Sequence, residues 1–136
     1  MIRYLFIIIC LSLNLHALKI EITKGEVQPD PIAIVDFYNP DGLENLGENI
    51  AKVLTNDLEA SGLFIAIGKS AFLQTADSLA KEGPKMNNWR PLKARFLVYG
   101  TVKSIGSGKI SLSFRLFDVV TGQQMLGFEF DGEQKN

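Results

Sequence analysis

The spacing of hydrophobic and polar residues predicts a strand, a helix and a second strand in the first half of the chain. Residues 31–37 form a nearly continuous, partly β-branched apolar run, which is typical of a central strand covered on both faces. Residues 46–61 place their apolar side chains at helical spacing on one stripe. Residues 63–67 are again apolar. Because one helix separates the two strands, the segment predicts a βαβ unit with a right-handed connection.

Capping signals mark both ends of the predicted helix. Asn45, followed three residues later by Glu48, fits a capping box. Gly62 stands where the left-handed residue that ends a helix is expected. We therefore expect a side-chain cap at the start of this helix and a glycine terminator at its end.

Two further helical segments are expected before the chain returns to strands. Residues 70–81 predict a second, shorter helix. Residues 87–92 predict a turn of helix with Asn88 as its cap and Pro91 inside the first turn. Trp89 lies in this turn and is expected to be a core residue.

The last third of the chain reads as three strands joined by two turns. Residues 96–102 form an apolar run that is typical of a buried strand. Residues 110–116 alternate apolar and polar side chains, which predicts a second strand, and residues 125–130 predict a third. Residues 106–108 and 118–123 supply the turns. The predicted fold is therefore mixed α/β: a mixed sheet of about five strands, with two or three helices packed on it. In that sheet a βαβ unit is followed by an antiparallel meander.

Residues 1–17 have the three parts of a secretory signal peptide. Arg3 gives a basic start, residues 4–15 are largely apolar, and Ala17 supplies the small residue before cleavage. The apolar run is about a dozen residues long, which is shorter than the ~20 that a helix needs to span a bilayer. We expect cleavage between Ala17 and Leu18, which would release an exported, soluble chain.

Cleavage would also remove the chain's one cysteine and one histidine, Cys10 and His16. Nucleophilic systems built on Cys or His, thiol redox chemistry and Cys/His zinc sites are thereby excluded. The formal net charge of −1 offers no polybasic surface for nucleic acid. We expect no cofactor and no metal site.

A small exported enzyme that uses carboxylates alone is the catalytic hypothesis that this composition leaves open. Asp36 follows the predicted central strand, and strand ends in α/β sheets can carry catalytic groups. A pair such as Asp36 with Asp118 would need carboxylates ~5–10 Å apart across a cleft. No basic or nucleophilic residue accompanies Asp36 in the neighbouring segments, so a solvated strand-end carboxylate is the competing interpretation.

The mature amino terminus predicts a strand with one apolar face. Its residues are Leu18, Lys19, Ile20, Glu21, Ile22 and Thr23. Such a strand can pair within its own sheet or add to the edge of another protein's sheet, because either partner satisfies the same backbone hydrogen bonds. The residues alone leave both possibilities open.

Several segments, in this order and spacing, resemble the TolB family of the Tol-Pal system. Residues 15–22 and 31–37 are similar to the opening of these proteins, and residues 57–64 are similar to their helix-to-strand segment. Residues 96–102 and 114–118 resemble the two strands that follow. The resemblance covers nearly the whole mature chain.

The resemblance implies an amino-terminal α/β domain, which in the family precedes a six-bladed β-propeller. Here it implies that domain alone, over residues 18–136 and incomplete at its carboxyl end. In the family the propeller binds the lipoprotein Pal, and the mature amino-terminal strand contacts TolA. By position, Leu18 to Thr23 are the expected TolA-binding residues, and Pal binding is not expected.

The implied function is that of a non-enzymatic, monomeric protein-interaction domain in the periplasm of a Gram-negative cell. Its role would be in outer-membrane integrity and in invagination during cell division, without a small-molecule substrate or nucleic acid. One alternative is a truncated fragment with no independent function, because the absence of a final helix would leave one sheet face partly bare. The small carboxylate-dependent enzyme is the other.

Overall fold

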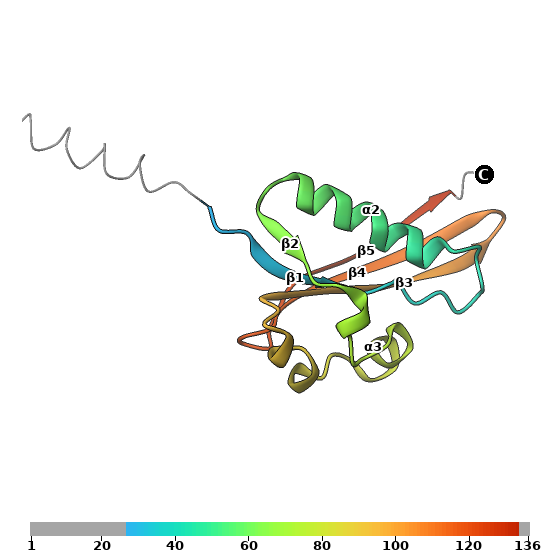
Figure 1. Cartoon of the computed structure of the whole chain (residues 1–136). Coiled ribbons are helices and arrows are strands. Elements are labelled where there is room, and N and C mark those ends of the chain that lie inside the picture. Colours follow the sequence, from blue (N-terminus) through green and yellow to red (C-terminus); the bar gives the residue numbers. More distant parts are fainter. Residues whose placement is uncertain (1–26, 134–136) are drawn as a thin grey trace, which may run out of the picture.

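A five-stranded mixed β-sheet forms the centre of the structure, a computed structural model that describes residues 27–133. Helices and short 3₁₀ turns connect its strands and cover its faces (Figure 1). The strands are β1 (Asp30–Ile34), β2 (Phe64–Ala66), β3 (Phe96–Gly106), β4 (Lys109–Asp118) and β5 (Gln124–Glu133). The helices are α2 (Leu46–Ala60) and α3 (Ala76–Glu82), and the 3₁₀ turns are Lys69–Ala71, Met86–Asn88 and Arg90–Leu92.

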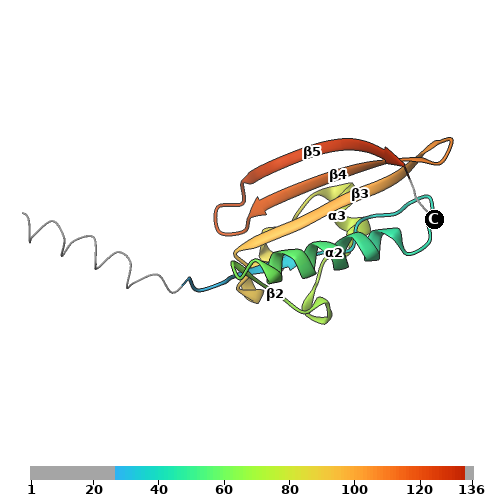
Figure 2. The same ribbon diagram turned by 90° about the horizontal axis from the view of Figure 1, so that it is seen from above.

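The strand order β2-β1-β3-β4-β5 joins a parallel half to an antiparallel half. β1 pairs in parallel with β2 and β3, and α2 connects β1 to β2. β3, β4 and β5 form an antiparallel meander, which lies beside α2 in the view from above (Figure 2). The predicted α/β fold, with its βαβ unit and following meander, is confirmed.

One face of the sheet packs against α2. The buried residues of this core are Ile32, Ile34, Phe37, Ala51, Val98 and Val102. The apolar stripe of α2 adds Leu46, Ile50, Leu54 and Leu58. These four residues follow the helical spacing seen in the sequence, so burial of this stripe explains why the segment forms a helix here.

The other face packs against α3 and the 3₁₀ turns, which lie below the sheet in Figure 1. Its buried residues are Ala33, Val35, Leu79, Trp89, Ala94, Leu97, Tyr99 and Val119. Trp89 is fully buried, which confirms its predicted place in the core. Strands β1 and β3 therefore send apolar side chains to both faces, as the near-continuous apolar runs predicted.

The start of α2 differs from the prediction, whereas its end agrees. Asn45 has a left-handed backbone conformation (φ 50°) and its side chain makes no capping hydrogen bond, so the predicted capping box with Glu48 is wrong. A capping residue normally has extended dihedrals, which let its side chain reach the first free amides, and Asn45 does not. Gly62 has a φ of 76°, and its amide donates to the carbonyl of Glu59 at 3.0 Å, so it ends the helix as expected.

The second helix is shorter than predicted, because the segment over residues 70–81 is interrupted. Lys69–Ala71 is a 3₁₀ turn, and α3 begins only at Ala76. Thr75 caps it, accepting a hydrogen bond from the amide of Ser78 at 3.1 Å. Between the two pieces lies Gln74, a buried polar residue whose side chain bonds to neighbouring segments.

The expected cap at Asn88 is also wrong. Asn88 ends one 3₁₀ turn, and Trp89 occupies the cap position of the next, without a side-chain hydrogen bond. Pro91 lies inside that second turn, as predicted. The chain bends between these two 3₁₀ turns at Trp89, and the bend lets the indole of this residue lie in the core.

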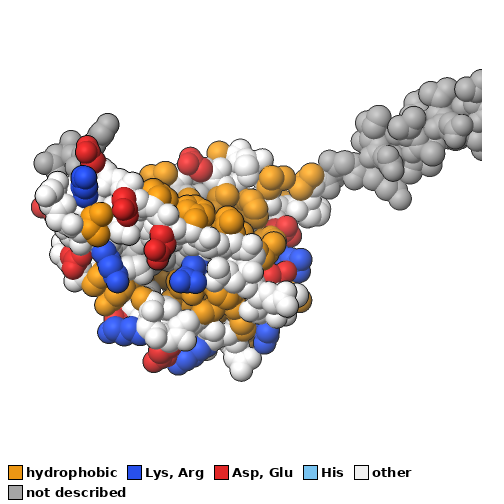
Figure 3. Space-filling view, turned by 180° about the vertical axis from the view of Figure 1, so that it is seen from behind, with side chains coloured by type: hydrophobic (Ala, Val, Ile, Leu, Met, Phe, Trp, Pro, Cys, Tyr) orange, Lys and Arg blue, Asp and Glu red, His pale blue; other side chains and the backbone are white. Residues whose placement is uncertain are grey.

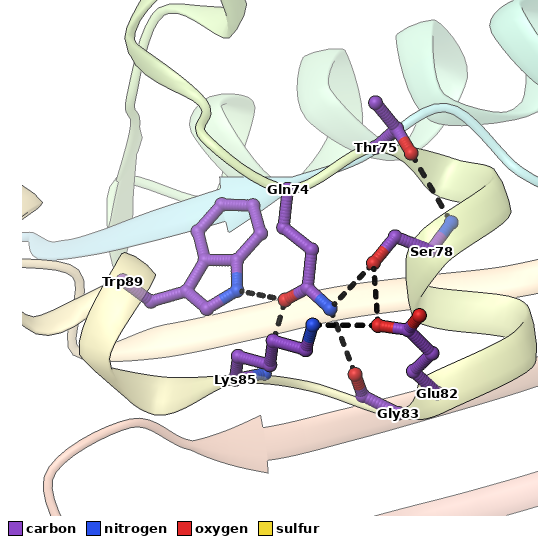
Figure 4. Close-up of polar contacts among 7 residues, drawn as sticks. All are labelled: Gln74, Thr75, Ser78, Glu82, Gly83, Lys85 and Trp89. Atoms are coloured by element: carbon purple, nitrogen blue, oxygen red, sulfur yellow. Dashed lines mark hydrogen bonds and ion pairs between the residues drawn. The ribbon is translucent and has the colours of Figure 1, made fainter.

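Gln74 connects the segments before and after α3 through both polar atoms of its side-chain amide (Figure 4). Its Nε2 donates to the carbonyl of Gly83 at 2.8 Å, and its Oε1 accepts from the amide of Lys85 at 3.0 Å. These bonds hold residues 83–85, which follow α3, against Gln74, which precedes α3. Burying a side-chain amide is costly unless its hydrogen bonds are made, and here they are made.

Candidate functional site

The predicted partner-binding residues Leu18, Lys19, Ile20, Glu21, Ile22 and Thr23 lie outside the described residues, as do Ala17 and the expected cleavage site. The described chain begins at Val27, three residues before β1. Whether the segment from Leu18 to Thr23 pairs with the domain's own sheet therefore stays a prediction.

Asp36 and Asp118 belong to separate ion pairs and do not form a shared site. Asp36 pairs with Lys69, so the expectation that no basic residue accompanies it is wrong. An oxygen of Asp118 lies 3.6 Å from a guanidinium nitrogen of Arg95. Asp118 also accepts hydrogen bonds from the amides that follow it in its turn, which is a structural role.

Register along β3 separates the two carboxylates. Asp118 pairs with Phe96, at the start of β3. Asp36 lies between Val35, which bonds to Val98, and Tyr38, which bonds to Gly100. Two to four residues of strand correspond to roughly 7–13 Å along the strands. Asp36 follows β1 and Asp118 ends β4, on opposite sides of β3, so two inter-strand spacings of about 4.8 Å add to this offset and place the two residues beyond the ~10 Å limit of such a pair. Neither carboxylate lines any of the hollows described below, so the geometry offers no paired-carboxylate centre.

Within residues 27–133, no group of three or more His, Cys, Asp or Glu side chains is placed to hold a metal ion. In the same part of the chain, no helix combines the length and the hydrophobicity needed to cross a membrane.

An apolar groove of about 520 Å³ runs between α2 and the outer strands of the meander. Its residues are Phe37, Leu46, Asn49, Ile50, Val53, Leu54, Leu112, Phe114, Leu126, Phe128 and Phe130. One helix about 10 Å wide covers only part of a sheet whose five strands are about 4.8 Å apart. α2 lies over the parallel half, so the groove is the uncovered part of the face over β4 and β5.

Aromatic rings form the floor of the groove. The ring of Phe114 stacks on that of Phe128 at 5.0 Å, and Phe128 stacks on Phe130 at 5.8 Å. Phe128 and Phe130 nevertheless remain 45% and 48% exposed. Viewed from behind, hydrophobic side chains gather along the upper part of the molecule (Figure 3). Contiguous exposed apolar surface of this kind marks interaction sites.

β5 forms one edge of the sheet and differs from the opposite edge, β2, in length. β5 has 10 residues and β2 has 3. Side chains at alternate positions of β5 face opposite sides of the sheet. Leu126, Phe128 and Phe130 point to the groove, while Glu129 and Asp131 pair across with Ser113 and Ser111 on the α3 side.

A second hollow, of about 460 Å³, lies on the α3 side of the sheet. Its lining combines the wall of α3 with hydroxyl groups, the cations Lys103 and Arg115, and the carboxylate of Glu129. Tyr99 lies in this hollow, and burial raises the pKa of its phenol, while the charge of Arg115 acts in the opposite direction. The ring of Tyr99 stacks on Phe117 at 5.7 Å, which shows that it serves the core as well.

The groove does not follow from the sequence pattern, although part of its signal is visible there. Residues 125–130 predict a strand, and their alternation places Leu126, Phe128 and Phe130 on one face. Exposure of that face depends on β5 being an edge strand and on α2 lying elsewhere. Local periodicity predicts neither the position of β5 in the sheet nor the position of α2 on it.

Comparison with known proteins connects this fold to one family. A family model described as the TolB amino-terminal domain matches residues 18–125. A Tol-Pal system protein TolB of Paramagnetospirillum magneticum is 41% identical over 111 residues, which are 81% of this chain and 25% of that protein.

Solved structures share the arrangement at lower identity. TolB from Acinetobacter baumannii aligns with a TM-score of 0.60 and 24% identity, over 78% of this chain and 24% of that one. The LpoB C-terminal domain from Salmonella enterica aligns with a TM-score of 0.61 and 18% identity, over 81% of this chain and 87% of that one. At these identities the likeness shows the fold alone.

The present chain spans about a quarter of the length of the curated TolB relative. The family match extends over most of the chain, from Leu18 to Met125, and includes α2, α3 and strands β1 to β4. The chain therefore belongs to the family of TolB amino-terminal domains of the Tol-Pal system.

Proposed function

We propose that this protein is a periplasmic, non-enzymatic interaction domain of the Tol-Pal system that engages TolA through strand addition by Leu18–Thr23. The observation that carries the proposal is family membership, with 41% identity to a Tol-Pal system protein TolB. The fold adds support, because its described residues offer packed cores and an apolar groove but no paired-carboxylate centre.

The start of the family match supports the position of the binding strand. The match begins at Leu18, the residue that cleavage after Ala17 would make the first of the mature chain. Leu18, Ile20 and Ile22 would then form one apolar face of a free terminal strand. A strand in this position can add to a partner's sheet through its backbone, with its alternating side chains providing selectivity.

A titration with the C-terminal domain of TolA tests the binding strand. The chain from Leu18 is expected to bind with a Kd in the micromolar range or weaker, because such contacts are small. A chain that starts at Lys24 should not bind. Ile20→Pro, which removes a backbone donor, should abolish binding, whereas Glu21→Gln should retain it. Equal binding by the chains with and without Leu18–Thr23 would reject the proposal.

Export is tested separately. When the full chain is expressed with its amino-terminal segment intact, the protein recovered from the periplasm should have the mass of a chain that begins at Leu18. Recovery of the uncleaved chain from the cytoplasm would contradict the proposed location, whatever the result with TolA.

A further inference from the structure

We propose that β5 is an acceptor edge for an extended peptide strand that alternates apolar and basic residues. The proposal does not depend on the TolA interaction, in which this chain would donate a strand. It concerns the opposite role, in which this chain receives one. The edge, the groove and the charges of β5 each contribute to it.

The backbone of β5 is open to pairing. Half of the N–H and C=O groups of an edge strand point away from the sheet and can bond to another strand. Natural edges are commonly protected by shortness, proline, bulges or charged side chains, and the edge strand β2 is only 3 residues long. β5 has 10 residues and no proline, and its register with β4 shifts near its start. Its charged side chains are all acidic, so they disfavour an acidic partner strand but not a basic one.

The groove side of β5 selects apolar residues in the partner. A strand paired with β5 would place alternate side chains next to Leu126, Phe128 and Phe130. Cross-strand neighbours on one face lie about 4.5–5.5 Å apart, so apolar partner residues would contact these half-exposed rings. The sheet would thereby gain a sixth strand at the margin of the apolar groove.

The opposite side of β5 selects positive charge. Glu129, Asp131 and Glu133 occupy alternate positions there, and all three are exposed. Lys109 lies across from Glu133 in the register, and Lys103 and Arg115 line the same hollow as Glu129. Nevertheless, no described Lys or Arg forms an ion pair with any of the three carboxylates. Lys or Arg at every second position of a partner strand would face this row of acids.

The same acids disfavour a second copy of this chain as the occupant. Two β5 strands that pair antiparallel with Phe130 opposite its own copy would place Glu129 of one copy opposite Asp131 of the other, on one face. Carboxylates of the two copies would then be opposite or diagonal neighbours, at about 5–8 Å, where like charges repel. In the same geometry, the carboxylates of β5 would attract the Lys or Arg side chains of a basic partner strand.

Synthetic peptides test the proposal on the chain from Leu18, which contains every described element. The probe is a capped ten-residue peptide that alternates valine and lysine, and its binding is followed by fluorescence anisotropy. We expect it to bind at least tenfold more tightly than the matched valine–glutamate peptide. A valine–lysine peptide with alternate N-methylated amides should lose binding, because it cannot pair along the edge. Equal binding by the N-methylated peptide would overturn the proposal.

Matched variants locate the site. Glu129→Lys with Asp131→Lys should reverse the preference in favour of the valine–glutamate peptide. Glu44→Lys with Glu48→Lys changes the net charge equally, at exposed positions before and within α2, and should leave the preference unchanged. The same response in both variants would mean attraction by net charge alone and would overturn the proposal. So would a dimer in sedimentation measurements that pairs through β5, since the occupant would then be a second copy.

Discussion

The indole Nε1 of Trp89 donates a 2.9 Å hydrogen bond to the side-chain Oε1 of Gln74, fifteen residues earlier in the chain. Trp89 is fully buried, and the ring of Phe72 packs against it edge-on at 5.1 Å. A buried indole almost always finds a partner for its N–H, and here that partner comes from the break between two helical segments (Figure 4). The bond therefore links the placement of Trp89 to the late start of α3.

Loss of the Gln74 amide should destabilise the domain strongly. Gln74→Leu leaves the indole of Trp89, the amide of Lys85 and the carbonyl of Gly83 without their partner. The buried indole that loses its hydrogen bond costs about 1–3 kcal/mol, and the groups of Lys85 and Gly83, which are closer to solvent, cost less, so we expect a total loss of about 2 kcal/mol or more. Urea denaturation measures the free energy of unfolding. Gln123→Leu, at an exposed turn position, should change that energy by less than about 0.5 kcal/mol.

Gly47→Ala should destabilise the domain although alanine is the better helix former. A Cβ at position 47 would lie 2.0 Å from the carbonyl oxygen of Phe37, so either α2 or the segment after β1 must move. In an open helix the same change would stabilise by about 1 kcal/mol, whereas a clash with backbone should cost about 2 kcal/mol or more. Gly132→Ala, where nothing lies within 4 Å, is the control and should be nearly neutral. A more stable Gly47→Ala variant would contradict the close approach.

Alkaline pH should weaken the fold through Tyr99. Because burial raises the pKa of its phenol, the folded state holds the proton more tightly than the unfolded state does. The resulting stability is fully present below the unfolded pKa of about 10 and is lost as the pH rises through the higher folded value. Thermal unfolding between pH 9 and about 11 should show this loss, and Tyr99→Phe should reduce it. If Tyr99→Phe and the unmodified chain lose stability in parallel, the phenol is not the responsible group.

The apolar groove should bind small hydrophobic dyes in the folded protein. Phe128→Gln removes a ring that stacks on both Phe114 and Phe130, so we expect dye fluorescence to fall by at least half. The free energy of unfolding should fall by about 1–2 kcal/mol, because the ring of Phe128 is about half-buried against those two rings, and the domain should stay folded. Val120→Gln alters an apolar residue that is 61% exposed in a turn away from the groove, and it should leave the dye signal unchanged. An unchanged signal in Phe128→Gln would mean that the dye binds elsewhere.

Local periodicity was sufficient for the main elements of the fold. The stripe of Leu46, Ile50, Val53, Leu54 and Leu58 predicted α2, and Gly62 predicted its end, because helix spacing and a left-handed terminator are properties of neighbouring residues. Val53 alone of this stripe is exposed, at 58%, because it faces the groove. The apolar run at residues 31–37 likewise predicted a strand with both faces covered.

Only the tertiary structure decided the features that depend on contacts between distant segments. Asn45 carries the side chain of a cap, but the path from β1 into α2 gives it a left-handed backbone. Gln74 lies in a segment with helical periodicity, yet its bond to Trp89 breaks the helix there.

The candidate interaction surface shows the same division. From sequence, residues 110–116 and 125–130 are two similar strands of a meander, and their alternation indicates that each has an apolar face. Only the order of strands in the sheet makes β4 an inner strand and β5 an edge, with Phe128 and Glu129 exposed on its two sides. Strand order and helix placement are set by burial summed over the whole sheet, so no local pattern could have revealed them.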